Sequence, residues 1–207
     1  MQALHIRLMQ FHYFDCDESV KSEEFPIHFE INNQPFKLIS DFGVFSKDEL
    51  DIGTLTLINA SMNEHVFGNV LDLGCGIGTV GIVLKYFNKD LNVDMCDVNE
   101  RALNLAKRNI DNYKFENCNV FYSDAYQNVS KEYDFIITNP PIRAGKKVVD
   151  DFILNSYDHM AKNGTLLVVM RKSHGAPSAK NRLMEKFGNC DIILRNKGFY
   201  ILKSKKL

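Results

Sequence analysis

Residues 70–79 read Val-Leu-Asp-Leu-Gly-Cys-Gly-Ile-Gly-Thr, and this stretch decides the fold class of the chain. Residues 70–73 form a short apolar run typical of a buried strand, and residues 79–87 are the expected helix. Glycines at alternate positions between them let the backbone turn tightly and approach a bound nucleotide closely. The stretch therefore predicts an α/β fold with a nucleotide-containing cofactor at a strand–loop–helix turn.

Strands and helices are expected to alternate downstream of this turn. Strands are predicted at residues 91–96, 120–122, 135–138 and 165–170, and helices at residues 99–113 and 147–160. This alternation favours a parallel sheet with helices on both faces. Only residues 195–198 separate two later apolar runs, and so short a connection requires an antiparallel pair. We expect a Rossmann-like, seven-stranded, mainly parallel sheet with an antiparallel C-terminal strand.

The first third of the chain has a different pattern. Residues 27–40 alternate between apolar and polar side chains around a turn at residues 32–35, which indicates a β-hairpin. Residues 51–62 are expected to be a helix. We divide the chain into residues 1–62, with the N-terminal segment, the hairpin and a helix that covers the cofactor, and residues 63–207, the cofactor-binding catalytic core. Together they are expected to form one compact domain.

The composition is that of an ordinary globular protein. The chain has 207 residues, of which 45% are hydrophobic and 25% charged, and no uncharged apolar stretch approaches the roughly 20 residues of a membrane span. The five cysteines form no C-x-x-C pair, which argues against a disulfide framework and a zinc site, and the histidines show no metal-ligand spacing. We expect a soluble protein of the reducing cytoplasm, with no metal site and no membrane partner.

The net charge of −1 conceals a split along the sequence. Residues 1–137 hold 11 basic and 21 acidic side chains, whereas residues 138–207 hold 14 basic and 5 acidic ones. The two parts therefore carry net charges of −10 and +9. For any single lysine or arginine, solvation is the simpler role. The sum nevertheless favours a positive face and a polyanionic partner such as RNA.

The glycine loop fits two kinds of cofactor. Residues 76–81 match the G-x-G-x-x-G pattern of dinucleotide sites, and Asp97 lies 21 residues beyond Gly76, near the separation at which an acid binds a ribose hydroxyl. The loop also has an additional leading glycine, Gly74, with Asp72 two residues before it. A carboxylate there would meet the ammonium group of S-adenosylmethionine, directly or through water, but would repel a pyrophosphate. These two residues favour S-adenosylmethionine over a nicotinamide cofactor.

A second motif, Asn139-Pro140-Pro141-Ile142, follows the fourth expected strand, at the edge where open α/β sheets place their chemistry. The exocyclic amine of a base is a weak nucleophile because its lone pair is delocalised into the ring. The side-chain oxygen of Asn139 and the carbonyl oxygen of Pro140 would accept both amine hydrogens and direct the lone pair at the methyl donor. The motif therefore predicts methyl transfer to a planar NH₂ group.

These motifs resemble those of the class I S-adenosylmethionine-dependent methyltransferases. More narrowly, the chain is similar to the small methyltransferase domain of the ribosomal RNA guanine-N2 methyltransferases of the small subunit, from about residue 11 onward. The resemblance rests on residues 43–47, the Asp51-x-Gly53-Thr54 helix start, residues 72–79, Asp97, Asp124 with Ala125, and residues 139–146.

The resemblance implies a set of site residues. Cofactor contacts would come from Phe45, Asp72, Gly74, Cys75, Gly76, Gly78, Asp97, Val98, Asp124 and Ala125, with Asp97 at the ribose, Asp124 and Ala125 at the adenine and Phe45 over the methionine end. The catalytic motif is Asn139, Pro140, Pro141 and Ile142, and the expected substrate contacts are Arg143, Lys146, Lys147, Arg171 and Lys172.

The chain departs from the superfamily at Ile142, where many members have an aromatic residue that stacks on the acceptor base. Phe42, Phe45 or a residue near Arg171 would then supply the missing ring face. We expect methyl transfer from S-adenosylmethionine to an exocyclic amine, with guanine N2 of small-subunit ribosomal RNA preferred. Two alternatives stay open: a protein glutamine N5 methyltransferase acting on release factors, and a cofactor- or RNA-binding module without turnover, which only Ile142 supports.

Overall fold

A central sheet forms the framework of the chain. The computed structural model describes residues 22–42, 44 and 50–207. The sheet contains β3 (Asn69–Leu73), β4 (Asn92–Asp97), β5 (Cys118–Tyr122), β6 (Tyr133–Thr138), β7 (Met160–Arg171), β8 (Asp191–Asn196) and β9 (Phe199–Lys205), in the order β5-β4-β3-β6-β7-β9-β8. β9 pairs antiparallel with both neighbours, and all other pairs are parallel. The predicted Rossmann-like sheet with an antiparallel C-terminal strand is confirmed.

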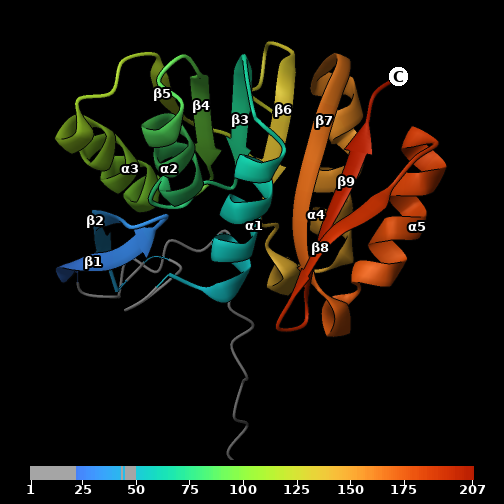
Figure 1. Cartoon of the computed structure of the whole chain (residues 1–207), viewed down its shortest axis with the longest axis horizontal. Helices are drawn as coiled ribbons and strands as arrows, with labels where there is room; N and C mark the ends of the chain where they lie inside the picture. Colours follow the sequence, from blue (N-terminus) through green and yellow to red (C-terminus); the bar gives the residue numbers. More distant parts are fainter. Residues whose placement is uncertain (1–21, 43, 45–49) are drawn as a thin grey trace, which may run out of the picture.

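Helices cover both faces of the sheet (Figure 1). α1 (Ile52–Asn63), α2 (Thr79–Phe87) and α3 (Glu100–Tyr113) lie on one face, and α4 (Lys146–Leu154) and α5 (Ala176–Phe187) on the other. Successive side chains of a strand point to opposite faces. Val70 therefore packs in the core beneath α1, α2 and α3, whereas Leu71 and Leu73 pack in the core beneath α4 and α5. Burial on both faces explains why the strands are short apolar runs.

A separate two-stranded hairpin lies beside α3 (Figure 1). β1 (Glu24–Ile31) and β2 (Gln34–Asp41) are joined by a turn at Asn32 and Asn33, which both have positive φ, as a two-residue hairpin turn requires. The predicted hairpin is therefore present, with a tighter turn than expected. Gln34 and Pro35 belong to β2 and pair with β1.

One buried side chain of α3 connects this hairpin to the glycine loop. Asn109 accepts a hydrogen bond from the Ile39 N–H at 2.8 Å and donates to the Ile39 carbonyl at 3.0 Å, as a neighbouring strand would. It also donates to the carbonyl of Ile77 in the glycine loop at 3.1 Å. Because a buried amide is costly to leave unpaired, these bonds fix β2 next to the loop that β3 leads into.

The helix predicted over residues 147–160 is wrong at its end. α4 ends at Leu154 and is followed by a 3-10 segment, Asn155–His159, so that β7 begins where the helix was expected to finish. The hydroxyl of Ser156 donates to the Ile153 carbonyl at 2.7 Å. Such local side-chain bonds compete with the helical hydrogen-bond pattern.

α5 has no counterpart among the helices predicted from the sequence, although its boundary signals are ordinary ones. Pro177 stands in its first turn, and Gly188 follows its last turn with a φ of 74°. Its buried side chains recur every three or four residues and pack in the same core as Leu202 of β9; they are Ala176, Ala179, Leu183 and Phe187.

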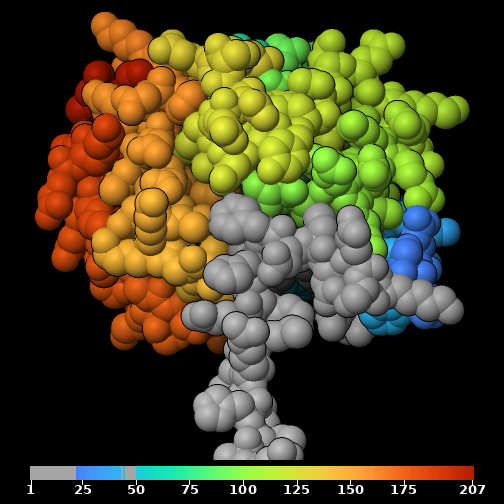
Figure 2. All heavy atoms as spheres, turned by 180° about the vertical axis from the view of Figure 1, so that it is seen from behind, coloured from blue at the N-terminus to red at the C-terminus, as the bar shows by residue number. Residues whose placement is uncertain are grey.

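The late, basic part of the sequence also occupies one half of the structure. Figure 2 shows the face that carries α4, with the later residues (yellow to red) on one side and the β3–β5 half (green) on the other. This follows from the topology, because from β6 outward the sheet continues only with β7, β9 and β8. The basic residues after residue 137 therefore lie in one half of the structure.

Within the described ranges, no helix combines the length and the apolar character that crossing a membrane demands. In the same part of the chain, no three His, Cys, Asp or Glu side chains gather as metal ligands would. The described cysteines all have free thiols: Cys75, Cys96, Cys118 and Cys190.

Candidate active site

The carboxyl ends of three neighbouring strands converge at one edge of the sheet. β3 leads into the glycine loop, β4 ends at Asp97 and β6 leads into Asn139. Leu73 of β3 pairs with Cys96 on one side and Thr138 on the other, and the Thr138 hydroxyl donates to the Leu73 carbonyl at 2.8 Å. The glycine loop, Asp97 and Asn139 are therefore neighbours at the edge where parallel α/β sheets bind ligands.

The glycines of the loop have different roles. Gly74, Gly76 and Gly78 all have positive φ, between 55° and 86°, where a side chain would be strained. A Cβ at Gly78 would lie 3.2 Å from atoms of Ile82 and Met95, so this glycine is needed for the packing of α2. Among the residues that the structure describes, none has an atom within 4 Å of a Cβ placed at Gly76. This side of Gly76 is thus not packed against the described core, which fits a ligand that approaches the loop closely.

Asp97 joins the loops that follow β3 and β4. Its Oδ2 accepts from the Gly76 N–H at 2.8 Å, and its Oδ1 accepts from the Asn99 N–H at 2.9 Å. Burial raises the pKa of Asp97, and these N–H donors partly offset that rise. Each carboxylate oxygen keeps a lone pair for one further donor, such as a ribose hydroxyl. Sequence reasoning assigns Asp97 to the ribose but misses this second role, fixing the glycine loop.

Asp72 caps α2 from the preceding strand. The N-cap residue of this helix, Gly78, has no side chain to accept from the first turn, and Asp72 Oδ2 accepts instead from the Gly81 N–H at 2.9 Å. Asp72 is 3% exposed, and this burial raises the pKa of its carboxyl group to about 7; the Gly81 bond opposes the rise and the charge of Asp97 adds to it. A buried carboxylate of this kind is stabilised by a cation placed against it.

Asp72→Asn is expected to stabilise the ligand-free protein at high pH, because asparagine keeps an acceptor for Gly81 without carrying a charge. The pKa of Asp72 is raised on folding, so its contribution to stability is full below about pH 4 and is lost as the pH rises through about 7. From about pH 5 to pH 8, the free energy of unfolding of the wild type should fall by about 2 to 3 kcal/mol relative to the variant. Urea unfolding at both pH values measures this, and parallel pH profiles would contradict the raised pKa.

Cys75 and Val98 lie at the same edge, in the glycine loop and directly after Asp97. Cys75 is buried, and burial raises the pKa of its thiol well above the ordinary value, so the thiol is a packing group and not a nucleophile. Val98 is half-buried. Phe45, expected over the methionine end of the cofactor, lies outside the described residues.

The loop after β5 carries Asp124 and Ala125 to this edge. The Ser123 N–H donates to the Asp97 carbonyl at 3.0 Å, which ties the loop to the end of β4. The Ser123 hydroxyl donates to the Ala125 carbonyl at 2.7 Å and stabilises the positive φ of 45° at Ala125. Asp124 is exposed. Both residues are thus placed beside Asp97, as an adenine-binding role requires.

The Asn139-Pro140 segment presents two acceptors. Among the residues that the structure describes, neither Asn139 Oδ1 nor the Pro140 carbonyl accepts a hydrogen bond. The Pro141 carbonyl, by contrast, accepts from the Ala144 N–H at 3.0 Å within a 3-10 turn, Ile142–Ala144. Pro140 is buried, and Ile142 packs against the core beneath α4. The two unpartnered acceptors are those that the sequence assigns to an amine.

α1 reaches Asn139 with its first turn. Asp51, the N-cap, accepts from the Thr54 N–H at 3.0 Å and from the Thr54 hydroxyl at 2.5 Å. The Asn139 Nδ2 group donates to Thr54 Oγ1 at 3.2 Å. A Cβ at Gly53 would lie 2.9 Å from the ring of Phe199, so the same turn packs directly on β9. No sequence signal could reveal the contact between Thr54 and Asn139, because 85 residues separate them.

Basic side chains line this edge along β6, β7 and the β8–β9 turn. The predicted substrate residues are all exposed: Arg143, Lys146, Lys147, Arg171 and Lys172. Lys146 forms an ion pair with Asp150 at 2.7 Å, and its charge is therefore less available to a phosphate group. The Arg171 guanidinium lies 4.8 Å from the centre of the Phe199 ring. Phe199 is thus the aromatic residue near Arg171, and it packs beneath α1.

The end of β8 and the turn after it add two exposed cations, Arg195 and Lys197, that sequence reasoning does not single out. The Lys172 N–H donates to the Gly198 carbonyl at 2.8 Å, which joins this turn to the end of β7. The turn lies at the carboxyl edge because β9 runs antiparallel to β7.

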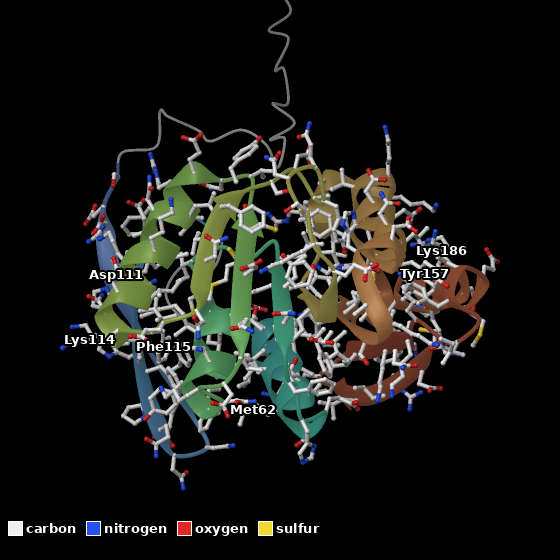
Figure 3. All side chains as sticks on the ribbon, turned by 90° about the horizontal axis from the view of Figure 1, so that it is seen from above. Met62, Asp111, Lys114, Phe115, Tyr157 and Lys186 are labelled. Atoms are coloured by element: carbon white, nitrogen blue, oxygen red, sulfur yellow. The ribbon has the colours of Figure 1, made fainter. Side chains whose placement is uncertain are left out.

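Other cations of residues 138–207 lie away from this edge. Lys206 lies at the opposite edge, where its Nζ donates to the carbonyl of Met160, the first residue of β7, at 2.8 Å. Lys186, near the end of α5, lies 5.2 Å from the centre of the Tyr157 ring (Figure 3). The prediction of a single positive face is therefore wrong, because the basic side chains lie at both edges of the sheet and on α5.

Comparisons with known proteins agree with the predicted resemblance. The model of the methyltransferase small domain family matches residues 35–203. "Uncharacterized protein YbxB" of Bacillus subtilis (strain 168) is 41% identical over 201 residues, which are 96% of this chain and 100% of that protein. A "Ribosomal RNA small subunit methyltransferase C" of Photorhabdus laumondii is 32% identical over 168 residues, which are 79% of this chain and 48% of that protein. The chain thus spans about half the length of this relative.

A solved structure with the same fold is the "T. Thermophilus 16S rRNA N2 G1207 methyltransferase (RsmC) in complex with AdoMet and Guanosine". It matches with a TM-score of 0.80 at 21% sequence identity, and covers 89% of this chain and 51% of that chain. At this identity the likeness shows the fold alone. The family model, however, extends from β2 to β9 and includes every described residue of the site. The chain belongs to the methyltransferase small domain family.

Proposed function

We propose that the protein transfers a methyl group from S-adenosylmethionine to an exocyclic amine, and that this amine is N2 of a guanine in small-subunit ribosomal RNA. Two acceptors beside the glycine loop support this function most directly: Asn139 Oδ1 and the Pro140 carbonyl, to which no described residue donates. A planar NH₂ group has two hydrogens to donate, and two acceptors on adjacent residues match them.

The cofactor would be held by the glycine loop and the acids around it. The ribose hydroxyls would bind the remaining lone pairs of Asp97, and the ammonium group would balance the buried charge of Asp72. Asp124 and Ala125 would contact the adenine, and the hairpin and α1 would cover the ligand. When bound, S-adenosylmethionine supplies an electrophilic methyl group on its sulfonium sulfur.

The residues of the chain would prepare the amine for attack. Asn139 Oδ1 and the Pro140 carbonyl accept its two hydrogens and so hold the nitrogen with its lone pair turned toward the methyl group. The same two oxygens stabilise the positive charge that develops on the nitrogen as it takes the methyl group. The bond between methyl carbon and sulfur would break, S-adenosylhomocysteine would leave, and the nitrogen would lose one proton to solvent. Because both acceptors are already fixed by β6 and the prolines, no reorganisation is needed at that moment.

Ribosomal RNA is the favoured substrate for two reasons. Relatives named for methylation of small-subunit ribosomal RNA match most of this chain, including one of Aliivibrio fischeri (strain MJ11) that is 29% identical over 97% of it. In addition, exposed cations stand at the same edge as the acceptors, where RNA phosphates would lie; they are Arg143, Lys147, Arg171, Lys172, Arg195 and Lys197.

A glutamine side-chain amide of a protein is the second candidate substrate, since Asn139 and Pro140 suit any planar NH₂ group and Ile142 offers no aromatic ring to a base. Incubation with methyl-labelled S-adenosylmethionine and separated RNA and protein fractions of cells that lack the protein tests both. We expect N2-methylguanosine in digested small-subunit RNA. Label in N5-methylglutamine would establish the second candidate, and cofactor binding without label in either fraction would identify a module without turnover.

Replacing the cations of the carboxyl edge should weaken RNA binding and reduce its salt dependence. Each phosphate contact contributes about −0.7 to the slope of log affinity against log salt on single-stranded RNA. The variant in which Arg171, Lys172, Arg195 and Lys197 are all glutamine should therefore lose up to about 3 units of slope. Its affinity for S-adenosylmethionine should not change.

The matched control replaces four cations outside this edge, Lys162, Lys180, Lys186 and Lys205, with glutamine. It has the same net charge as the first variant but should keep the wild-type slope. Titrations at several salt concentrations compare the two variants. Equal losses in both would mean that overall charge, and not the carboxyl edge, governs binding.

A further inference from the structure

Three hydrogen-bonded side chains lead from the start of α1 to the acceptor site. The Thr54 hydroxyl donates to Asp51 Oδ2 at 2.5 Å, and Asn139 Nδ2 donates to Thr54 Oγ1 at 3.2 Å. Thr54 is 8% exposed, so water has little access to compete for these bonds. Asp51 and Thr54 belong to the first turn of a helix whose residues are far from β6 in the sequence.

The Asp51 carboxylate determines which group donates in each of these hydrogen bonds. A carboxylate only accepts, so Thr54 uses its one hydroxyl hydrogen on Asp51 and has only lone pairs left for Asn139. The NH₂ end of the Asn139 amide must then face Thr54, and Oδ1 must face the opposite way, where no described residue donates to it.

The orientation matters because the two ends of an asparagine amide have nearly the same shape, and only hydrogen bonds distinguish them. With the amide reversed, Asn139 would present two hydrogens to the hydrogens of the incoming amine. On the basis of the function proposed above, we propose that Asp51 and Thr54 are positioning residues: through Asn139 they keep an acceptor turned toward the substrate amine.

The turn that carries Thr54 is itself fixed against the sheet. Gly53 packs on the Phe199 ring, where even a Cβ would approach to 2.9 Å. Thr54 therefore has a defined place relative to Asn139.

Thr54→Val tests the contact, because it removes the hydroxyl and keeps the shape. We expect the single-turnover rate of methyl transfer to small-subunit RNA to fall about tenfold or more, with affinity for S-adenosylmethionine within about twofold of the wild type. Thr54→Ser restores the hydroxyl and should recover most of the rate. Thr56→Val is the matched control: it removes another buried hydroxyl of α1 with two hydrogen bonds, but none to Asn139, and should keep the rate within about twofold.

Asp51→Asn separates positioning from helix capping. Asparagine caps helices as well as aspartate, so the melting temperature should change little. Its NH₂ group would donate to Thr54, however, and free the Thr54 hydroxyl to donate to Asn139, which would turn the amide oxygen inward. We expect a loss in rate of about tenfold at unchanged cofactor affinity. A purely capping role predicts no loss, and that result would overturn the proposal.

The double variant Thr54→Val with Asn139→Ala gives an independent reading. If Thr54 acts only through Asn139, the double variant should be no slower than Asn139→Ala alone, within about twofold. Additive losses, a fully active Thr54→Val, a loss confined to cofactor affinity, or an equal loss in Thr56→Val would each overturn the positioning role while leaving the proposed function intact. A wild type that transfers no methyl group would overturn both.

Discussion

Asn139→Ala is expected to slow single-turnover methyl transfer by about 10²- to 10³-fold. The substitution removes one of the two acceptors for the amine and leaves only the Pro140 carbonyl, so the lone pair is no longer directed at the methyl group. Binding of S-adenosylmethionine should stay within about twofold of the wild type, because Asn139 is assigned to the amine alone. Rapid quenching at saturating cofactor and RNA measures the rate without a contribution from product release.

Asn196→Ala is the matched control for this experiment. Asn196 is also half-buried and also donates to a threonine of α1, at 3.0 Å, but it is the last residue of β8. Its removal should leave the rate within about threefold at saturating RNA. If Asn139→Ala transferred methyl groups as fast as the wild type, Asn139 would have no part in preparing the amine.

Asp97→Ala should lower the affinity for S-adenosylmethionine about 10- to 100-fold. A charge-assisted hydrogen bond to a ribose hydroxyl contributes about 1.5 to 3 kcal/mol, which corresponds to this range of affinity. The variant also loses the acceptor that fixes the Gly76 N–H, so the glycine loop would be less well ordered for the ligand. Isothermal titration calorimetry gives the affinity, with NADH titrated in parallel.

Asp94→Asn serves as the control for burial. Asp94 lies on the same strand and is equally buried, at 6% exposure, but its partners are the Tyr133 hydroxyl at 2.7 Å and Lys131 at 2.8 Å. We expect a loss of stability without a loss of cofactor affinity. Tight binding of NADH together with no binding of S-adenosylmethionine would instead favour the dinucleotide interpretation of the loop.

The parts of the site that follow the strands could be predicted from the sequence because their signals are local. Glycine spacing, an acid at the end of the next strand and an Asn-Pro-Pro segment after β6 each depend on a few consecutive residues. Parallel topology then brings them together without further information, since neighbouring strands end at the same edge. The same reasoning placed Asp72, Asp97 and Asn139 beside one another, where the structure has them.

The parts that could not be predicted depend on contacts between distant segments. No sequence pattern indicates that Thr54, bonded to Asp51, accepts a hydrogen bond from Asn139. None indicates that Asp72 caps α2. The charge count of residues 138–207 is correct, but the direction of each strand decides which edge a lysine reaches. Because β9 runs antiparallel to β7, Lys206 directly after it lies at the opposite edge from Arg171. α5, in contrast, has readable boundary signals at Pro177 and Gly188.

The place of β9 in the sheet makes the candidate site depend on a strand that follows all the other described strands in the sequence. β9 follows β7 and β8 in the sequence but lies between them, and its first residue, Phe199, supports the turn of α1 that holds Asn139. Because β9 joins β8 to β7, the surface on which the first turn of α1 packs is incomplete until residues 199–205 are in place.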